Sequence, residues 1–144
     1  VHDAARPLLS PDVMRRTVES AIQNGAAIAA LPVFDTVKCV REQNIEATLP
    51  RDEIYLAQTP QVFRREVLNE ALQAAKTANY QGTDCSSLVE RLRATNRVLA
   101  SGELVPLVKI VAGDAQNFKV TYANDLLRAE AILREGKFFN NEVR

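Results

Sequence analysis

The chain has 144 residues, of which 47% are hydrophobic and 25% are charged, a composition typical of one globular domain with a single core. This composition excludes collagen-like, disordered and membrane-spanning chains. Because 18 basic residues balance 18 acidic ones, no long-range field attracts nucleic acid or anionic lipid, and we expect neither partner.

The cysteines and glycines exclude several kinds of site. Cys39 and Cys85 lie far apart and His2 is the only histidine, so no structural zinc site can form, and we expect two free thiols in a reducing cytoplasm. No two of the five glycines are close enough in sequence for a GxGxxG or Walker loop. Any anionic ligand must therefore be held by other local groups.

The chain opens with elements of an α/β domain. Val1 to Asp3 resemble the end of a buried strand whose earlier residues are missing, so we expect a fragment. Ser10 and Pro11 supply an N-cap and a first helical position for a helix that ends at Asn24. The apolar run 26–33 predicts a strand covered on both faces, as in a parallel sheet.

Strict alternation from Asp35 to Leu49 predicts a hairpin of two half-buried strands around a turn at 41–43. An isolated two-stranded hairpin is marginally stable in water, and this one has few large apolar residues. We therefore expect the hairpin to pack against something outside its own core, and a partner subunit is the natural candidate.

The second half of the chain continues the alternation of strands and helices. The predicted elements are a strand at 54–57, a helix from Phe63 to Ala75, a helix after the Thr83-Asp84 turn, apolar runs at 97–100 and 105–111, a strand at 117–121, and a last helix capped by Thr121 or Asn124 and closed by Gly136. The tail 140–144 is expected to be frayed.

This order of elements predicts an α/β domain with one projecting antiparallel hairpin. In such sheets, ligands bind beyond the carboxyl ends of the strands, here expected at 2–7, 35–36, 58–61 and 113–119.

Several side chains at these ends could bind a phosphate. Asp3 and Arg6 together could hold a metal-bound phosphate, or could simply pair with each other across a loop. The hydroxyls of Thr59 and Thr83 could receive a phosphate or a substrate hydroxyl, or could serve ordinary turns and caps. Lys119 could meet an anion or point to solvent.

Taken together, these segments carry a family resemblance. In chain order they are HDAARP from His2, DTVK from Asp35, QTPQVF from Gln58, TD from Thr83, SLVE from Ser87, GD from Gly113, Asn117 and KVT from Lys119. They resemble the 2-C-methyl-D-erythritol 4-phosphate cytidylyltransferase family. The resemblance implies that residues 1–144 are the carboxy-terminal portion of a single domain: a Rossmann-like nucleotidyltransferase sheet with flanking helices and a β-hairpin dimerisation arm at about 34–56.

The resemblance also implies an activity. The family transfers CMP from CTP, with Mg²⁺, to the phosphate of 2-C-methyl-D-erythritol 4-phosphate. A related alternative is a ribitol 5-phosphate cytidylyltransferase. The family's glycine-rich nucleotide loop has no counterpart here, so we expect these 144 residues alone not to turn over CTP. A third alternative for them is a non-catalytic scaffold that dimerises and binds substrate.

The roles of individual residues follow from the same resemblance. It implies that Lys119 and Arg51 are catalytic and place the substrate phosphate. It implies that Asp3 faces the nucleotide and the metal, and that substrate is bound by Asp3, Arg6, Thr36, Thr59 and Thr83. Thr36 and Arg51 would lie on the arm and complete the site of the neighbouring subunit in a twofold homodimer.

The chain departs from the family pattern at two places. Cys85-Ser86 stand where an acidic residue and an alanine are expected. The segment 91–111 is longer than usual, with added turns expected at 93–96 and 101–103, and we expect it to be a surface elaboration.

Overall fold

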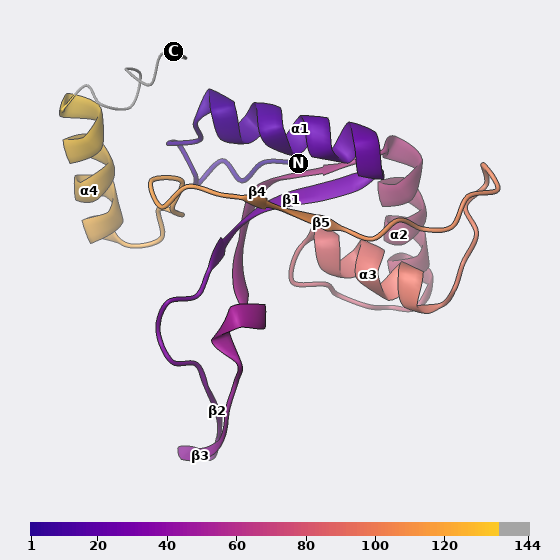
Figure 1. Cartoon of the computed structure of the whole chain (residues 1–144), viewed down its shortest axis with the longest axis horizontal. Coiled ribbons are helices and arrows are strands. Elements are labelled where there is room, and N and C mark those ends of the chain that lie inside the picture. The colour runs from indigo at the N-terminus through magenta and orange to yellow at the C-terminus, as the bar shows by residue number, and fades with distance from the viewer. Residues whose placement is uncertain (136–144) are drawn as a thin grey trace.

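A three-stranded sheet forms the centre of the computed structural model, which describes residues 1–135 (Figure 1). Strand β1 (Ala26–Pro32) lies in the middle, antiparallel to β4 (Tyr55–Phe63) and parallel to β5 (Lys109–Ala112). The first five residues of β1 are buried. The prediction of a strand covered on both faces is therefore confirmed, within a sheet that is mixed and not wholly parallel.

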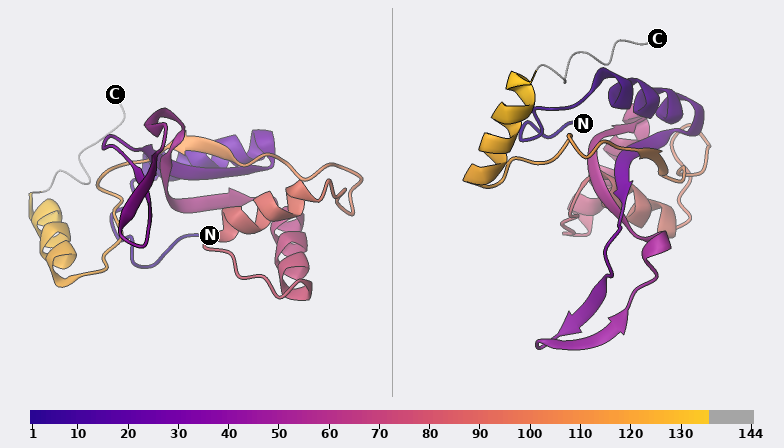
Figure 2. Two further views of the ribbon diagram at one scale, coloured as in Figure 1. Left: turned by 90° about the horizontal axis from the view of Figure 1, so that it is seen from below. Right: turned by 60° about the vertical axis from the view of Figure 1, so that its left-hand side comes forward.

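Three helices cover the two faces of this sheet. Helix α1 (Pro11–Asn24) lies on one face, and α2 (Arg65–Thr77) and α3 (Cys85–Ala94) lie together on the other (Figures 1 and 2). No helix within residues 1–135 combines the length and the apolar character that crossing a bilayer requires.

The ends of α1 are those that the sequence predicts. The Oγ of Ser10 accepts a hydrogen bond from the backbone N–H of Val13 at 3.3 Å. Gly25 closes the helix with φ at 86°, a left-handed conformation that glycine adopts without a Cβ penalty.

A hydrophobic core lies between α2, α3 and the segment before β5. Its buried members are Val67, Ala71, Val89, Leu92, Leu99 and Val105. Leu99 and Val105 belong to the longer segment expected to be only a surface elaboration, and for these two residues that expectation is wrong. Their side chains cover apolar faces of α2 and α3 that would otherwise be exposed to water.

The hairpin projects far from the sheet (Figures 1 and 2). It consists of β2 (Lys38–Arg41) and β3 (Asn44–Thr48), and the 3₁₀ helix η1 (Arg51–Glu53) follows it. The hairpin itself is confirmed, but every residue of both strands is exposed in the single chain. The expected burial of one hairpin face therefore requires contacts from outside this chain.

The structure corrects the predicted bounds of β4. It starts one residue later than expected and continues through Phe63, so 58–61 lies within the strand and not beyond its end. Phe63 pairs with Ala26 of β1, and α2 begins only at Arg65. Because Gln58 and Gln61 are polar, the apolar pattern of the sequence does not show that the strand continues beyond Ala57.

The two ends of the described chain also differ from prediction. Val1 is 62% exposed, and residues 1–3 form no strand although Val1 exchanges backbone hydrogen bonds with Gln61. Residues 117–121 form no strand either. The last helix, α4 (Ala123–Arg134), has Tyr122 and not Thr121 or Asn124 at its N-cap. The predicted closure at Gly136 and the tail lie outside the described residues.

Candidate active site

Four separate segments converge on one pocket of about 280 Å³. They are the opening segment, strand β4, the turn before α3, and the extended segment 113–121 after β5. The pocket is lined by Asp3, Arg6, Ala57, Gln58, Thr59, Gln61, Thr83, Asp84 and Lys119. Five of the seven predicted site residues therefore lie together: Asp3, Arg6, Thr59, Thr83 and Lys119.

An ion pair spans this pocket. The Nζ of Lys119 lies 3.0 Å from the Oδ2 of Asp3. The other carboxylate oxygen of Asp3 accepts a hydrogen bond from the backbone N–H of Ala5 at 3.0 Å. That backbone bond, followed by Lys119, holds the pKa of Asp3 below its usual value. Asp3 is thus an anion at neutral pH, and the ammonium group beside it is partly exposed and accessible to a second anion.

Arg6 is held by carbonyl oxygens. Its Nη1 donates to the carbonyl of Asn117 at 2.7 Å and its Nη2 to the carbonyl of Ala57 at 3.4 Å. Burial lowers the pKa of Arg6, and the charge of Asp3 opposes that shift. The alternative in which Asp3 and Arg6 merely pair is wrong, because the ion pair of Asp3 is with Lys119.

The two threonines occupy different environments. The Oγ1 of Thr59 accepts a hydrogen bond from the backbone N–H of Asp3 at 3.0 Å and lies 2.8 Å from the Nδ1 of His2. Thr59 therefore fixes the opening segment against β4. Thr83 is exposed in the turn that leads to α3 and lines the pocket.

Asp84 lines the pocket with its oxygens already engaged. It is the N-cap of α3 and accepts from the backbone N–H of Ser87 at 2.9 Å, from the Oγ of Ser86 at 2.9 Å, and from the Nε2 of Gln61 at 2.7 Å. Burial alone would raise the pKa of Asp84, but these hydrogen bonds outweigh it and hold the pKa below its usual value. The helix predicted to follow the Thr83-Asp84 turn is thereby confirmed.

Three buried amides at this site received no role from the sequence: Gln58, Gln61 and Asn117. Gln58 donates to the carbonyl of Asp114, Gln61 to the carboxylate of Asp84, and Asn117 to the carbonyl of Thr59. Two glutamines within a strand that pairs with the buried β1 could have indicated a polar site, because buried polar side chains need hydrogen-bond partners.

Thr36 and Arg51 do not line the pocket. Arg51 lies in η1 on the arm, where its Nη1 donates to the carbonyl of Phe34 at 2.9 Å. Thr36 is exposed just before β2. Within one chain these two residues are apart from the other five, so their predicted role depends on a second subunit.

The pocket offers few ligands to a divalent cation. Within residues 1–135 no group of three or more His, Cys, Asp or Glu side chains could hold a metal ion. Asp3 has a partly exposed carboxylate in the pocket. This donor set fits Mg²⁺, which commonly binds through one or two carboxylates plus substrate phosphates and water.

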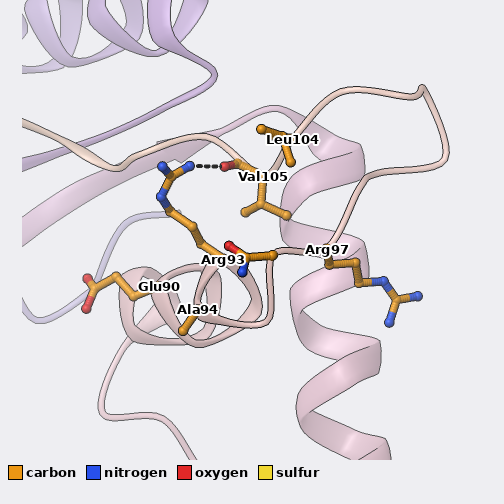
Figure 3. Close-up of a pocket in the computed structure, with 7 residues that line it drawn as sticks. Glu90, Arg93, Ala94, Arg97, Leu104 and Val105 are labelled. Atoms are coloured by element: carbon orange, nitrogen blue, oxygen red, sulfur yellow. Dashed lines mark hydrogen bonds between the residues drawn. The ribbon is translucent and has the colours of Figure 1, made fainter.

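A larger cavity, of about 350 Å³, lies between α3 and the segment before β5. None of the predicted site residues lines it. Arg93 donates a hydrogen bond to the carbonyl of Val105, and the charged ends of Glu90 and Arg97 point away from each other (Figure 3). Its charged groups do not converge on a common point, so size alone does not make this cavity the active site.

Comparisons with known proteins agree with the geometry. The family model described as 2-C-methyl-D-erythritol 4-phosphate cytidylyltransferase matches residues 1–135. The chain is similar to the enzyme of that name from Syntrophus aciditrophicus, with 42% identity over 136 residues, 94% of this chain and 53% of the relative. The chain thus spans about half the length of the curated relatives it matches.

Two solved structures share the fold. The crystal structure of 2-C-methyl-D-erythritol 4-phosphate cytidylyltransferase from Thermus thermophilus aligns with a TM-score of 0.77 and 35% identity, over 93% of this chain and 60% of that one. The 4-diphosphocytidyl-2C-methyl-D-erythritol synthase from Anaerococcus prevotii aligns with a TM-score of 0.78 and 30% identity, over 92% and 57%. The α/β fold expected from the sequence is thereby confirmed.

Proposed function

Because the chain belongs to the 2-C-methyl-D-erythritol 4-phosphate cytidylyltransferase family, we propose that its full-length protein transfers CMP from CTP to 2-C-methyl-D-erythritol 4-phosphate. The products are 4-diphosphocytidyl-2-C-methyl-D-erythritol and pyrophosphate. The observation that carries the proposal is the convergence of Asp3, Arg6, Thr59, Thr83 and Lys119 on one pocket.

In this reaction no side chain of the protein has to form a covalent bond to substrate. An oxygen of the substrate's own phosphate forms the new bond to the α-phosphorus of CTP, and the bond from that phosphorus to the bridging oxygen of pyrophosphate breaks. No side chain has to attack or take up a proton. Catalysis then depends on holding two anions in line and on balancing their charge.

Lys119 is suited to holding the substrate phosphate. Its ammonium group is a compact charge on a flexible stem, and it borders the pocket partly exposed to solvent. We assign the hydroxyls of Thr59 and Thr83 to the sugar-alcohol phosphate, and Arg6 to a substrate contact at the same pocket.

Mg²⁺ is proposed as the cofactor, held by the carboxylate of Asp3 together with phosphate oxygens of CTP. Bound there, the cation would neutralise charge as pyrophosphate leaves. The role of Asp3 within this chain is to keep an ionised carboxylate in the pocket, which its hydrogen bond from Ala5 and its ion pair with Lys119 both favour.

We further propose that the full-length protein is a homodimer joined through the arm at 34–56. The arm presents large apolar side chains to solvent in the single chain, including Phe34 at 79% exposed, Ile45 at 65% and Leu56 at 59%. Burial of these side chains against a second copy would bring Thr36 and Arg51 to that copy's pocket. The two free cysteines fit a cytoplasmic protein.

Paired assays of pyrophosphate release test the activity. Full-length protein with CTP and Mg²⁺ should turn over 2-C-methyl-D-erythritol 4-phosphate much faster than ribitol 5-phosphate. The same protein without Mg²⁺ and the isolated 144 residues, which carry no glycine-rich nucleotide loop, are the controls expected to be inactive. Preference for ribitol 5-phosphate would overturn the proposed substrate.

A further inference from the structure

We propose that two buried amides, Gln58 and Asn117, are positioning residues that set the placement of Lys119 in the pocket. This inference rests on the proposed function of Lys119 as the group that holds a phosphate. Lys119 lies in the segment 113–121, which belongs to no strand or helix. Something other than a regular ladder of hydrogen bonds must therefore hold this segment.

Gln58 clamps the start of that segment to β4. Its side chain is 5% exposed. The Nε2 donates to the carbonyl of Asp114 at 2.9 Å, and the Oε1 accepts from the backbone N–H of the same residue at 3.2 Å. One side chain thereby satisfies both backbone groups of Asp114, as a neighbouring strand would.

Gly113 leaves the room that this clamp needs. A Cβ at that position would overlap the Oε1 of Gln58 and would also lie 3.2 Å from the carbonyl oxygen of Ala30. The backbone N–H of Gly113 donates to that same carbonyl at 2.8 Å, which continues the pairing of β5 with β1. The clamp thus begins immediately where the sheet ends.

Asn117 links the segment to two further residues of the pocket. It is fully buried, and its Nδ2 donates to the carbonyl of Thr59 at 2.7 Å and to the Oε1 of Gln58 at 3.4 Å. The backbone carbonyl of Asn117 accepts a hydrogen bond from the Nη1 of Arg6 at 2.7 Å. Asn117 therefore fixes β4, Arg6 and the segment relative to one another, two residues before Lys119.

The other contacts of the segment act at Lys119, through its ion pair with Asp3, and beyond it. The backbone N–H of Val120 donates to the carbonyl of Ala5 at 2.8 Å, which fixes the far side of Lys119. Without the two amide side chains, the segment before Lys119 would lose their hydrogen bonds between it and β4, and would keep the bond from Arg6 to the backbone carbonyl of Asn117. An error of about 1 Å in the position of a reacting group can cost about 100-fold in rate.

Two substitutions remove the clamp without adding charge. Asn117→Ser leaves a hydroxyl too short to reach both acceptors, and Gln58→Met keeps the length of the side chain but removes its hydrogen bonds. Thr17→Val is the control, because it removes a buried hydrogen bond of 2.7 Å to the carbonyl of Val13, within α1 and outside the pocket. Each variant is made in the full-length protein, alone and with Lys119→Ala.

Three readouts are measured for each variant: Tm, kcat/KM for the sugar-alcohol phosphate, and the Kd of inorganic phosphate by titration calorimetry. We expect each amide variant to lower kcat/KM by about 10- to 100-fold and to weaken phosphate binding. In the Lys119→Ala background the same changes should cost less than about threefold, since they act through Lys119. Thr17→Val should lower Tm without either effect.

The opposite results overturn the inference. Equal losses with and without Lys119 would make the two amides structural, as would failure of both variants to fold. Wild-type protein that binds phosphate but does not turn over either sugar phosphate would refute the proposed function alone. In that case the loss of phosphate affinity in the variants, and its dependence on Lys119, still decides whether Gln58 and Asn117 position the lysine.

Discussion

Replacing Lys119 by alanine should separate activity from stability. Among residues 1–135, the ammonium group of Lys119 has one charged partner, the carboxylate of Asp3 at 3.0 Å, and the two side chains are 53% and 31% exposed. Exposed ion pairs of this kind contribute little to folding. Asp3 also keeps its hydrogen bond from Ala5 when the lysine is gone. We therefore expect Tm to fall by less than about 4 °C.

The expected loss of activity is much larger. Lys119 supplies the full positive charge at the place assigned to the substrate phosphate, and removing one preorganised donor from a reacting anion costs about 100- to 1000-fold in rate. The assay is kcat/KM for the sugar-alcohol phosphate by pyrophosphate release, with Tm from calorimetry on the same samples. Lys109→Ala is the matched control, because Lys109 is exposed at the start of β5 and does not line the pocket.

Two results would refute this reasoning. A fall in Tm large enough to account for the lost activity would make Lys119 a structural residue. Activity within a few-fold of wild type would show that the ammonium group does not meet the reacting phosphate. The control should match wild type in both measurements, and a comparable loss in Lys109→Ala would also contradict a specific role for Lys119.

Two further predictions concern stability. Burial opposes the ionisation of Asp84, but hydrogen bonds from Gln61, Ser87 and Ser86 keep its folded pKa below the unfolded value. The ionised carboxylate of Asp84 therefore contributes fully to the free energy of unfolding above about pH 4, and this contribution is lost as the pH falls further. In urea unfolding, Asp84→Asn should therefore make stability depend less on pH below about pH 4. Leu92→Ala, at a core position 3% exposed, should cost about 2–5 kcal/mol in urea unfolding and leave kcat/KM of the folded protein unchanged.

The elements with strong local signals were predictable from the sequence. The cap at Ser10, the stop at Gly25 and the apolar run that follows define α1 and β1 within a residue or two of their observed bounds. Alternation from Asp35 located the hairpin for the same reason. In these places the local pattern and the tertiary structure favour the same conformation.

Sequence patterns failed where tertiary contacts decide the structure. A strand is predicted at 117–121, but Asn117 is buried and its side chain donates to the carbonyl of Thr59, and no strand forms. Gln58 and Gln61 are polar enough to suggest the end of β4, yet they are buried in it because partners beyond the strand satisfy their amides. No local pattern contains those partners.

The sequence predicts most residues of the candidate site but not which of them contact one another. The family motifs predicted seven site residues, and the structure brings five of them together in the pocket. The ion pair of Asp3 with Lys119 spans more than a hundred residues of sequence, so only the fold can reveal it. The contribution of Arg51 depends on a second copy of the chain and remains a prediction.

Complementation between two inactive full-length variants tests that contribution most directly. Arg51→Ala and Lys119→Ala are mixed in equal amounts under conditions that exchange subunits, and pyrophosphate release is measured. If the arm completes the partner's pocket, each hybrid dimer regains one intact site, and the mixture should recover about one quarter of wild-type activity. If both residues served the pocket of their own chain, or if the protein were a monomer, the mixture would stay as inactive as its components.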